Sequence, residues 1–247
     1  MTQKTNVTAA FVMIGDEILS GRTEDKNLNF LAKNLTEMGI NLREVRIVPD
    51  IENEIIFAVN EVRKKFDYVF TSGGIGPTHD DITSLAIAKA FEDELVQNIE
   101  ATEILEKYYG KENLNEARLK MAFVPRKARL LDNPVSSAPG FRIENVFVMA
   151  GVPKIFQAMF AAASKELSGG KKIKSKEVKT TLTESILAKD LENLQKKYPQ
   201  VTMGSYPFDG GTSLVFRSND YQLLEESATG MIEILERIKS GSIISAS

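Results

Sequence analysis

The sequence predicts an α/β protein, with a three-layer, doubly wound, mostly parallel sheet followed by a smaller α+β region. Apolar runs alternate with amphipathic helix patterns over about the first 90 residues, the order that builds a parallel sheet with helices on both faces. A glycine-rich loop joins the third apolar run to another helix pattern. After a short basic stretch the pattern changes to strand, helix, strand, strand, helix, which indicates a separate antiparallel layer.

The first part of the chain supplies the strands and helices of the parallel sheet. Residues 7–14 are almost continuously apolar, as in a parallel strand buried on both faces. Alternation over 40–48 predicts a second strand, and the short apolar run 68–70 predicts a third. Apolar residues spaced by three and four predict helices over 25–38 and about 51–65.

The middle of the chain is less regular. We expect one helical stretch running from residue 82 towards 109. Prolines interrupt 115–151, which predicts loops on one side of the sheet. A strand within 144–153 and a helix over 156–167 then complete the first domain.

A short, polar and basic stretch, 168–176, divides the chain into predicted domains 1–168 and 169–247. A solvated hinge explains this run of charge better than a nucleic-acid patch does. We expect a hairpin at 209–211 and a frayed tail after residue 239. The other elements expected here are strands over 178–182, 201–206 and 213–217 and helices over 184–197 and 221–238.

Composition narrows the chemistry. The 247-residue chain has no cysteine, one histidine and a net charge of −3. This composition excludes disulfides and cysteine nucleophiles, makes a Ser-His-Asp triad improbable, and gives no reason to expect nucleic-acid binding. No apolar run approaches the roughly 20 residues of a membrane span, so we expect a cytoplasmic protein without a membrane partner. Any metal should be a hard ion bound by oxygen, such as magnesium.

The most informative segment is DYVFTSGGIGPTHDDIT, residues 67–83. Gly73, Gly74 and Gly76 can adopt positive φ and let a ligand approach the backbone closely. Ser72 and Thr78 add hydroxyl donors. A tight turn without a ligand is the alternative, but the preceding strand, the following helix and the adjacent acids favour a phosphate-binding loop.

Acidic residues accompany this loop. Asp80 and Asp81 would repel a bound anion unless a divalent cation lay between them. Asp81 is also placed to cap the helix that follows, and Asp80 could be an ordinary loop acid. Asp50 follows the second strand and is either a turn former or a ligand at the carboxyl edge of the sheet. We expect Asp50 and Asp81 to hold the metal across a crevice, with Asp80 as a further catalytic acid.

Other candidates belong to the same edge. Gly15, Asp16 and Glu17 follow the first strand, and Ser136 and Gly140 precede the fourth. His79, the only histidine, is most simply a loop residue, although it could contact a phosphate when protonated.

These motifs resemble the MoCF-type molybdopterin-binding family. The segments that carry the resemblance are GDEILSGR at 15–22, the pair Asp25 and Asn27, IVPD at 47–50, TSGGIGPTHDDIT at 71–83, APGF at 138–141 and GVP at 151–153. The sequence is most similar to the CinA N-terminal domain and to the molybdopterin-binding-like domain of FAD synthase. KYPQVTMGSYP, at 197–207, resembles the companion region of those proteins.

The resemblance implies a ligand at the carboxyl edge, with acidic positions at Asp50 and Asp81 and Asn27 among the ligand-binding residues. It implies a divalent-metal-dependent pyrophosphohydrolase, using magnesium, manganese or cobalt, that releases AMP from ADP-ribose or FAD. A molybdopterin-binding protein without hydrolysis and a regulatory homologue without catalysis are the alternatives. Relatives of this fold also lead us to expect a homo-oligomer.

The sequence departs from the family pattern at several positions. Lys26 and Leu28 replace hydroxyl residues, Ser136 replaces a glycine and Ala150 replaces a proline. Ile155 stands where CinA has a glutamate, which favours the FAD-synthase-like branch.

Overall fold

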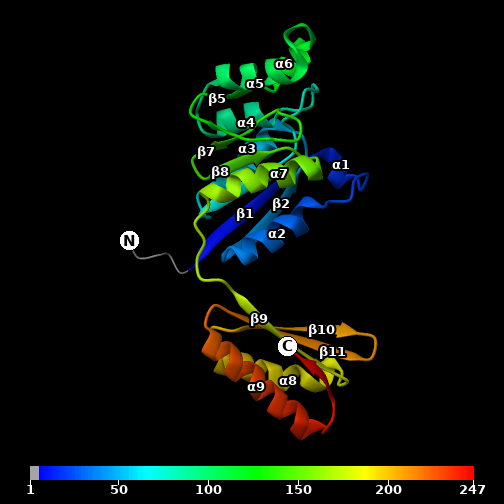
Figure 1. Ribbon diagram of the computed structural model, residues 1–247. Coiled ribbons are helices and arrows are strands. Elements are labelled where there is room, and N and C mark those ends of the chain that lie inside the picture. The colour runs from blue at the N-terminus through cyan, green and yellow to red at the C-terminus, as the bar shows by residue number, and fades with distance from the viewer. Residues whose placement is uncertain (1–5) are drawn as a thin grey trace. The chain divides into compact units, whose positions relative to one another are not determined.

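The computed structural model describes residues 6–247 (Figure 1). The chain divides in sequence, between Gly170 and Lys171, into two compact units. Each unit has its own hydrophobic core. The first unit carries the glycine-rich loop and most of the acidic candidates. The second unit is described separately below.

The first unit is built on a six-stranded sheet in the order β2-β1-β3-β8-β7-β6. Strands β2, β1, β3 and β8 are parallel neighbours, whereas β7 runs antiparallel to both β8 and β6. The predicted doubly wound, mostly parallel sheet is therefore confirmed. The strands are β1 (Val7–Ile14), β2 (Ile40–Val48), β3 (Tyr68–Ser72), β6 (Arg129–Leu131), β7 (Gly140–Ile143) and β8 (Val146–Met149).

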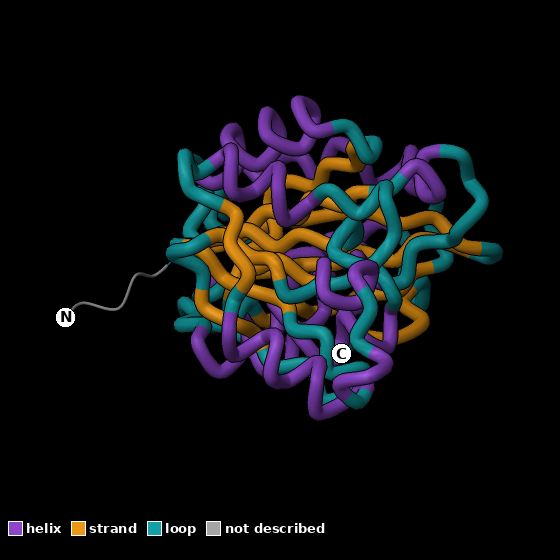
Figure 2. Tube along the Cα trace, turned by 90° about the horizontal axis from the view of Figure 1, so that it is seen from above, coloured by secondary structure: helices purple, strands orange, loops and turns teal. Residues whose placement is uncertain are grey.

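Helices cover both faces of this sheet, which makes the three layers (Figures 1 and 2). Side chains of β1 enter the two cores alternately: Val12 packs with α3 and α4, and Phe11 packs with α2 and α7. Both side chains are fully buried, which explains why this strand is apolar along nearly its whole length. The helices of the first unit are α1 (Asp16–Leu19), α2 (Asn27–Glu37), α3 (Glu52–Arg63), α4 (Thr83–Ala90), α5 (Ile99–Tyr109), α6 (Glu116–Lys120) and α7 (Pro153–Ala163), with 3-10 turns η1 (Lys111–Asn113) and η2 (Ser164–Glu166).

The single helix expected from residue 82 to 109 is wrong. Helix α4 ends before Phe91, and Glu92 then adopts a positive φ of 51°, which a helix cannot contain. Strand β4 (Leu95–Gln97) follows and pairs antiparallel with β5 (Phe123–Pro125). Asn98 starts α5 as a new helix by accepting the Ala101 N–H.

The second unit is a four-stranded antiparallel sheet in the order β10-β11-β9-β12, with α8 and α9 packed on one face. The expected frayed tail is also wrong, because β12 pairs with β9. Ser242, just before β12, accepts hydrogen bonds from the Thr181 N–H and the Thr180 hydroxyl, which holds the returning chain in place. The elements are β9 (Lys174–Thr180), α8 (Glu184–Lys197), β10 (Thr202–Phe208), β11 (Gly211–Ser218), α9 (Tyr221–Ile238) and β12 (Ile243–Ala246).

Strand β9 begins at Lys174, so the end of the basic stretch predicted as a hinge is part of the sheet. Within residues 6–247, no helix has both the length and the apolar character that a membrane crossing requires.

Candidate functional site

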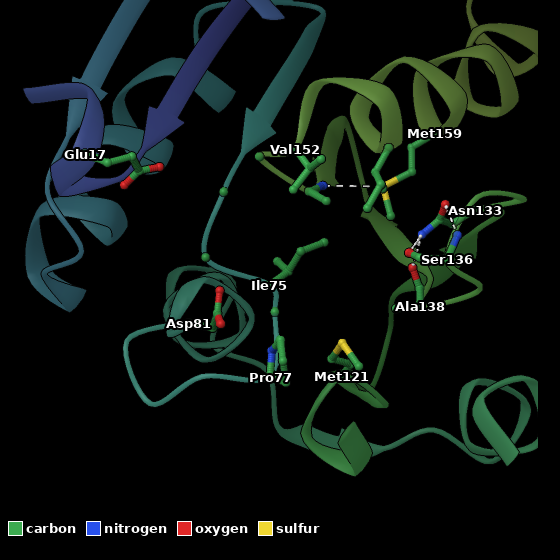
Figure 3. A pocket seen from close by; sticks show the side chains of 16 residues that line it. Glu17, Ile75, Pro77, Asp81, Met121, Asn133, Ser136, Ala138, Val152 and Met159 are labelled. Carbon is green, nitrogen blue, oxygen red and sulfur yellow. Dashed lines mark hydrogen bonds between the residues drawn. The ribbon is translucent and has the colours of Figure 1, made fainter. Parts of the chain in front are cut away.

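A cavity of about 340 Å³ opens at the carboxyl edge of the parallel sheet (Figure 3). Its walls come from the glycine-rich loop after β3, the segment after β8 and the loop that precedes β7. Ile75 projects into the middle of this space, towards Val152. Glu17 from α1 and Asp81 line it as well. The cavity is thus bordered by segments that are distant in sequence. They meet because the carboxyl ends of the parallel strands and the start of the antiparallel strand β7 lie at the same edge of the sheet.

The glycines of the loop are required by close backbone packing. Gly73 has a φ of 102°, and a Cβ atom there would lie 2.0 Å from the Ile14 carbonyl oxygen. Gly74 has a φ of 67°, and a Cβ atom there would lie 2.1 Å from the Thr83 hydroxyl. The Gly73 N–H already donates to the Met149 carbonyl at 3.1 Å. Gly73 therefore fixes the loop against the sheet and has no N–H to offer to a phosphate.

The next three residues provide the free donors. Within residues 6–247, the N–H groups of Gly74, Ile75 and Gly76 have no protein acceptor. Consecutive backbone N–H groups of this kind form an anion-binding concavity. If the loop binds phosphate as predicted, the donors are therefore residues 74–76 rather than Gly73. Ser72, at the end of β3, lies instead beside a smaller neighbouring cavity.

Asp81 closes the loop onto itself. Its Oδ2 accepts the Thr78 N–H at 2.8 Å and the Thr78 hydroxyl at 2.5 Å, and it lies against Gly76, where a Cβ atom would be 2.7 Å away. The expectation that Asp81 caps the next helix is wrong, because Ile82 is the N-cap residue of α4 and makes no side-chain cap. Lys120 donates to the Thr78 carbonyl from the other side. The carboxylate of Asp81 is held at the cavity wall by these contacts.

Asp50 lies within a group of acids. Its Oδ2 accepts the Asp16 N–H at 3.1 Å. Partial burial raises the pKa of the Asp50 carboxyl, the Asp16 N–H opposes this rise, and the charges of Glu17, Asp16 and Asp80 raise the pKa further. The negative charges of Asp16, Glu17 and Asp80 therefore act on Asp50, and a cation in this region would relieve that repulsion. The pKa of Asp80 itself is lowered, chiefly by a hydrogen bond from the Thr78 side chain.

The oxygen donors of this region suit a hard divalent cation, but they do not form a complete ion site by themselves. Within the described part of the chain, no three His, Cys, Asp or Glu side chains converge into a complete ion site. Magnesium commonly uses one or two carboxylates and completes its shell with water and phosphate oxygens. Glu17 connects the predicted ligands, since it lines the cavity with Asp81 and acts electrostatically on Asp50. The arrangement therefore suits a cation that arrives with, or is completed by, a phosphate ligand.

Asn27 is a buried polar residue with one unused group. Only 4% of it is exposed, its Nδ2 donates to the Gly151 carbonyl at 2.7 Å, and its Oδ1 has no partner among the described residues. It lines the smaller cavity of about 40 Å³, together with Glu17 and Ser72. That space is large enough for a water molecule or one small donor group. Asp25, the other member of the pair, accepts the N–H of Asn27 and so supports the start of α2.

The loop before β7 is organised by a residue that sequence reasoning missed. Asn133 is 3% exposed and donates to both the Ser136 hydroxyl and the Ala138 carbonyl at 2.7 Å. It thereby brings Ser136 to the cavity wall. The only available signal was its place at the start of NPVSSAPGF, where an Asn-Pro pair indicates a turn.

The other predicted residues, including Asp50, Asp16 and Thr78, do not line the cavity. Gly140 is buried in β7, where a Cβ atom would be 2.5 Å from the Val148 carbonyl oxygen. His79 and Asp80 are exposed on the loop, with His79 Nδ1 4.0 Å from Asp80 Oδ1. Gly15 lies against Glu17, since a Cβ atom there would be 2.5 Å from Glu17 Oε2.

Comparison with known proteins agrees with this architecture. Residues 10–168 match the model of the probable molybdopterin binding domain, and residues 172–246 match that of the FAD synthase middle domain. The chain therefore belongs to the family of probable molybdopterin binding domains.

Individual relatives extend this result. A protein from Archaeoglobus fulgidus is 33% identical over 224 residues, which cover 91% of this chain and 96% of that one. The probable FAD synthase of Caenorhabditis elegans is 33% identical over 258 residues, covering 92% of this chain but 50% of that protein. The crystal structure of the protein CinA, of unknown function, from Thermoplasma acidophilum is 35% identical, has a TM-score of 0.63, and covers 66% of this chain and 99% of that one. The predicted resemblance to CinA and to FAD synthase is confirmed, although the chain spans only half the length of the nematode protein.

Proposed function

We propose that this protein is a divalent-metal-dependent nucleotide pyrophosphohydrolase that releases AMP from a substrate such as ADP-ribose or FAD. The observation that carries the proposal is that Glu17 and Asp81 line the same cavity as Gly74, Ile75 and Gly76, whose N–H groups have no acceptor among the described residues. Donors for a phosphate and carboxylates for a cation are the two parts that such a hydrolysis needs.

The residues have distinct roles in this proposal. The N–H groups of Gly74, Ile75 and Gly76 donate to the phosphate oxygens and orient the pyrophosphate. Asp50 and Asp81 would hold a divalent cation, which would supply positive charge against the phosphate and lower the pKa of a water molecule. Glu17 faces the cavity and accepts the proton of the attacking water. The water oxygen bonds to the adenylate phosphorus, the phosphoanhydride bond breaks, and the second phosphate leaves.

The direct test is to incubate the purified protein with ADP-ribose or FAD and magnesium, manganese or cobalt, and to measure AMP by chromatography. We expect AMP with at least one metal and none after chelation. Asp81→Asn and Asp50→Asn should each lower the rate by about 100-fold, since they weaken charge stabilisation in the transition state. Asp209→Asn, in the hairpin of the second unit, is the matched control and should leave the rate unchanged. Absence of AMP with every metal would contradict the proposal.

A second candidate is a pterin-binding protein that does not turn its ligand over. The match of residues 10–168 to the probable molybdopterin binding domain favours it, and apolar Ile75, Val152 and Met159 could contact a flat ring. Saturable binding of molybdopterin, together with no AMP release from any nucleotide, would select this function over hydrolysis.

A further inference from the structure

We propose that the outer edge of β2 is the surface on which two copies of this chain associate. The two β2 strands pair antiparallel about Val45 and join two six-stranded sheets into one. This proposal does not depend on the proposed function. Strand β2 ends the sheet order β2-β1-β3-β8-β7-β6, and among the described residues β1 is its only strand partner. Its outer edge therefore offers backbone N–H and C=O groups to another strand.

The other edges of the two larger sheets are protected in ways that the edge of β2 is not. Strand β6 has three residues, β12 has four, and β10 contains Pro207, which has no N–H to donate. Strand β2 has nine residues, and its sequence, INLREVRIV, contains no proline, glycine or lysine. The chain that leaves the first unit contacts the turn before β2, where the Gly170 N–H donates to the Gly39 carbonyl at 3.2 Å. A long edge without these protective features is suited to strand addition.

The backbone groups of Val45 and Ile47 face the open side of the strand. The Val48 carbonyl accepts the Gly15 N–H at 3.1 Å, so the backbone groups of Val48 point towards β1. Because these directions alternate along a strand, the groups of Val45 and Ile47 point away from β1. A two-fold axis at Val45 therefore lets the two copies of this residue exchange both of their hydrogen bonds, as opposed residues do in an antiparallel ladder.

One face of this edge is apolar. In the pairing with β1, Val45 lies opposite Phe11 and Ile47 lies opposite Met13, and both partners belong to the core formed with α2 and α7. Val45 and Ile47 are nevertheless 38% and 43% exposed, so the helix cover on this face stops short of the edge. A second β2 strand would remove part of this apolar surface from water, which favours association.

The opposite face of the edge selects the partner. Glu44 and Arg46 lie there, and Arg46 Nη2 is 2.6 Å from Glu44 Oε1 within the strand. With the two-fold axis at Val45, Glu44 of each copy lies directly opposite Arg46 of the other. The pairing thus creates two cross-strand contacts between opposite charges, which stabilise an antiparallel pair. The edge is complementary to itself, so a second copy of this chain is the partner that it fits.

The same charges select the register. A two-fold axis at Arg43 would place two arginines directly opposite one another, which is destabilising. An axis at Ile47 would place Pro49, which has no N–H, opposite Val45. In the Val45 register the parallel strands of the two copies run in opposite directions, so each copy keeps its own ligand edge at a separate end of the joined sheet.

The experiment uses two charge reversals that repel in like pairs and attract in mixed pairs. Glu44→Arg places positive charges opposite one another when it pairs with itself, and Arg46→Glu does the same with negative charges. A mixture of the two variants restores both contacts between opposite charges. Glu192→Arg is the matched control, because Glu192 also forms an exposed pair within the chain, with Lys196 at 2.5 Å in the second unit. Sedimentation of the full chain measures the dissociation constant of the dimer, after circular dichroism has confirmed folding.

We expect the wild type to dimerise and each of the two edge variants to weaken self-association by about 100-fold, since like charges oppose one another twice in each pairing. Glu192→Arg should leave the dissociation constant unchanged. An equimolar mixture of Glu44→Arg and Arg46→Glu should dimerise about as tightly as the wild type. The amide hydrogens of Val45 and Ile47 should also exchange more slowly in the wild-type dimer than in either variant alone.

Three results would overturn the proposal. A wild type that stays monomeric at every concentration would leave the edge to an extended segment of a different protein. A dimer that neither charge reversal weakens would use another surface. Two variants that remain monomeric when mixed would exclude the pairing of Glu44 with Arg46 across the two-fold axis.

Discussion

The two units of this protein differ in where they leave polar groups unused. In the first unit, helices cover both faces of a parallel sheet, so the loops at the carboxyl ends of the strands are the surface on which ligands collect. Free N–H groups, the acids around Asp50 and the unpaired Asn27 Oδ1 lie there. In the second unit, helices cover one face of an antiparallel sheet, and the buried oxygen without a partner among the described residues, Glu225 Oε1, belongs to a side chain whose other oxygen pairs with Lys176 at 2.7 Å. Strand direction therefore decides where functional groups can gather.

The largest expected effect tests whether the units are separate in stability as well as in fold. Phe70, in the first unit, and Phe216, in the second, are both fully buried, and their cores share no residue. Either residue changed to alanine should cost about 3–5 kcal/mol, from lost burial and the cavity left behind. Hydrogen exchange followed peptide by peptide should show lost protection only in the unit that carries the substitution. Equal loss in both units would show that they unfold together.

Two glycines with similar backbone conformation, one in each unit, allow the cost of a side chain to be compared. Gly73 and Gly210 have nearly the same φ, 102° and 103°, but a Cβ atom at Gly210 meets nothing within 4 Å, whereas one at Gly73 meets the Ile14 carbonyl. Gly210→Ala should cost only the conformational strain of about 1–2 kcal/mol. Gly73→Ala should cost about 1–3 kcal/mol more and abolish phosphate binding, because the loop must shift. Urea denaturation of both variants measures the difference, and equal costs would mean that the loop adapts freely.

The raised pKa of Asp50, caused first by burial and then by the charges of its acidic neighbours, should show in a pH profile. Because the pKa of Asp50 is raised above its usual value of 3.8 on folding, the native state binds more protons than the unfolded state, and stability falls as pH rises through the raised value. Asp50→Asn removes this pH-dependent loss of stability. The amide oxygen of the asparagine can still accept the Asp16 N–H, so the hydrogen bond is kept. The variant should melt at a higher temperature than the wild type at pH 7, and the gain should disappear below about pH 3.8.

Two outcomes bear on this expectation. Millimolar magnesium should reduce the gain of Asp50→Asn at pH 7, since a bound cation relieves the same repulsion in the wild type. A gain that persists unchanged at pH 3 would show that packing, rather than charge, causes it.

The smallest effects should come from surface ion pairs in either unit. Lys89 in α4 lies 2.6 Å from Glu52 in α3, and Lys176 lies 2.7 Å from Glu225. Lys89→Ala and Lys176→Ala should each cost no more than about 1 kcal/mol, because exposed pairs are screened by solvent. A larger loss of unfolding free energy, measured by chemical denaturation, would show that the ion pair contributes substantially to the stability of the fold.

The sequence correctly predicted those elements of the fold that a local residue pattern determines. The continuous apolar run of β1 indicated a strand buried on both faces, and the strand-loop-helix order around Gly73 was also predicted, while phosphate binding by that loop remains a prediction. The errors arose where distant segments decide the structure. The break after α4 is held by Lys127 and Arg126, whose N–H groups bind Asp93 and Glu94, and no helix pattern contains that information.

The same limit applies to the site. The sequence singled out Asp81, but its side chain could equally have capped α4, and only the folded loop shows that Thr78 is its partner. The sequence analysis missed Lys120 and Asn133. Lys120 contacts a residue 42 positions away in the sequence. Asn133 acts by hydrogen bonding within the turn that it begins. Residues that act by holding other residues in place are not marked by a local sequence pattern.

One contact at the base of the large cavity limits how this site can change over time. Gly151 follows β8 so closely against the end of β3 that a Cβ atom on it would lie 3.3 Å from the Cα of Gly73. Main chain packs on main chain there: a larger residue at Gly73 would clash with the Ile14 carbonyl oxygen, and one at Gly151 would require its neighbour to shift by a few tenths of an ångström. Divergence of ligand preference among related chains must therefore proceed through side chains around the rim, such as Met121 and Val152, while the base stays the same.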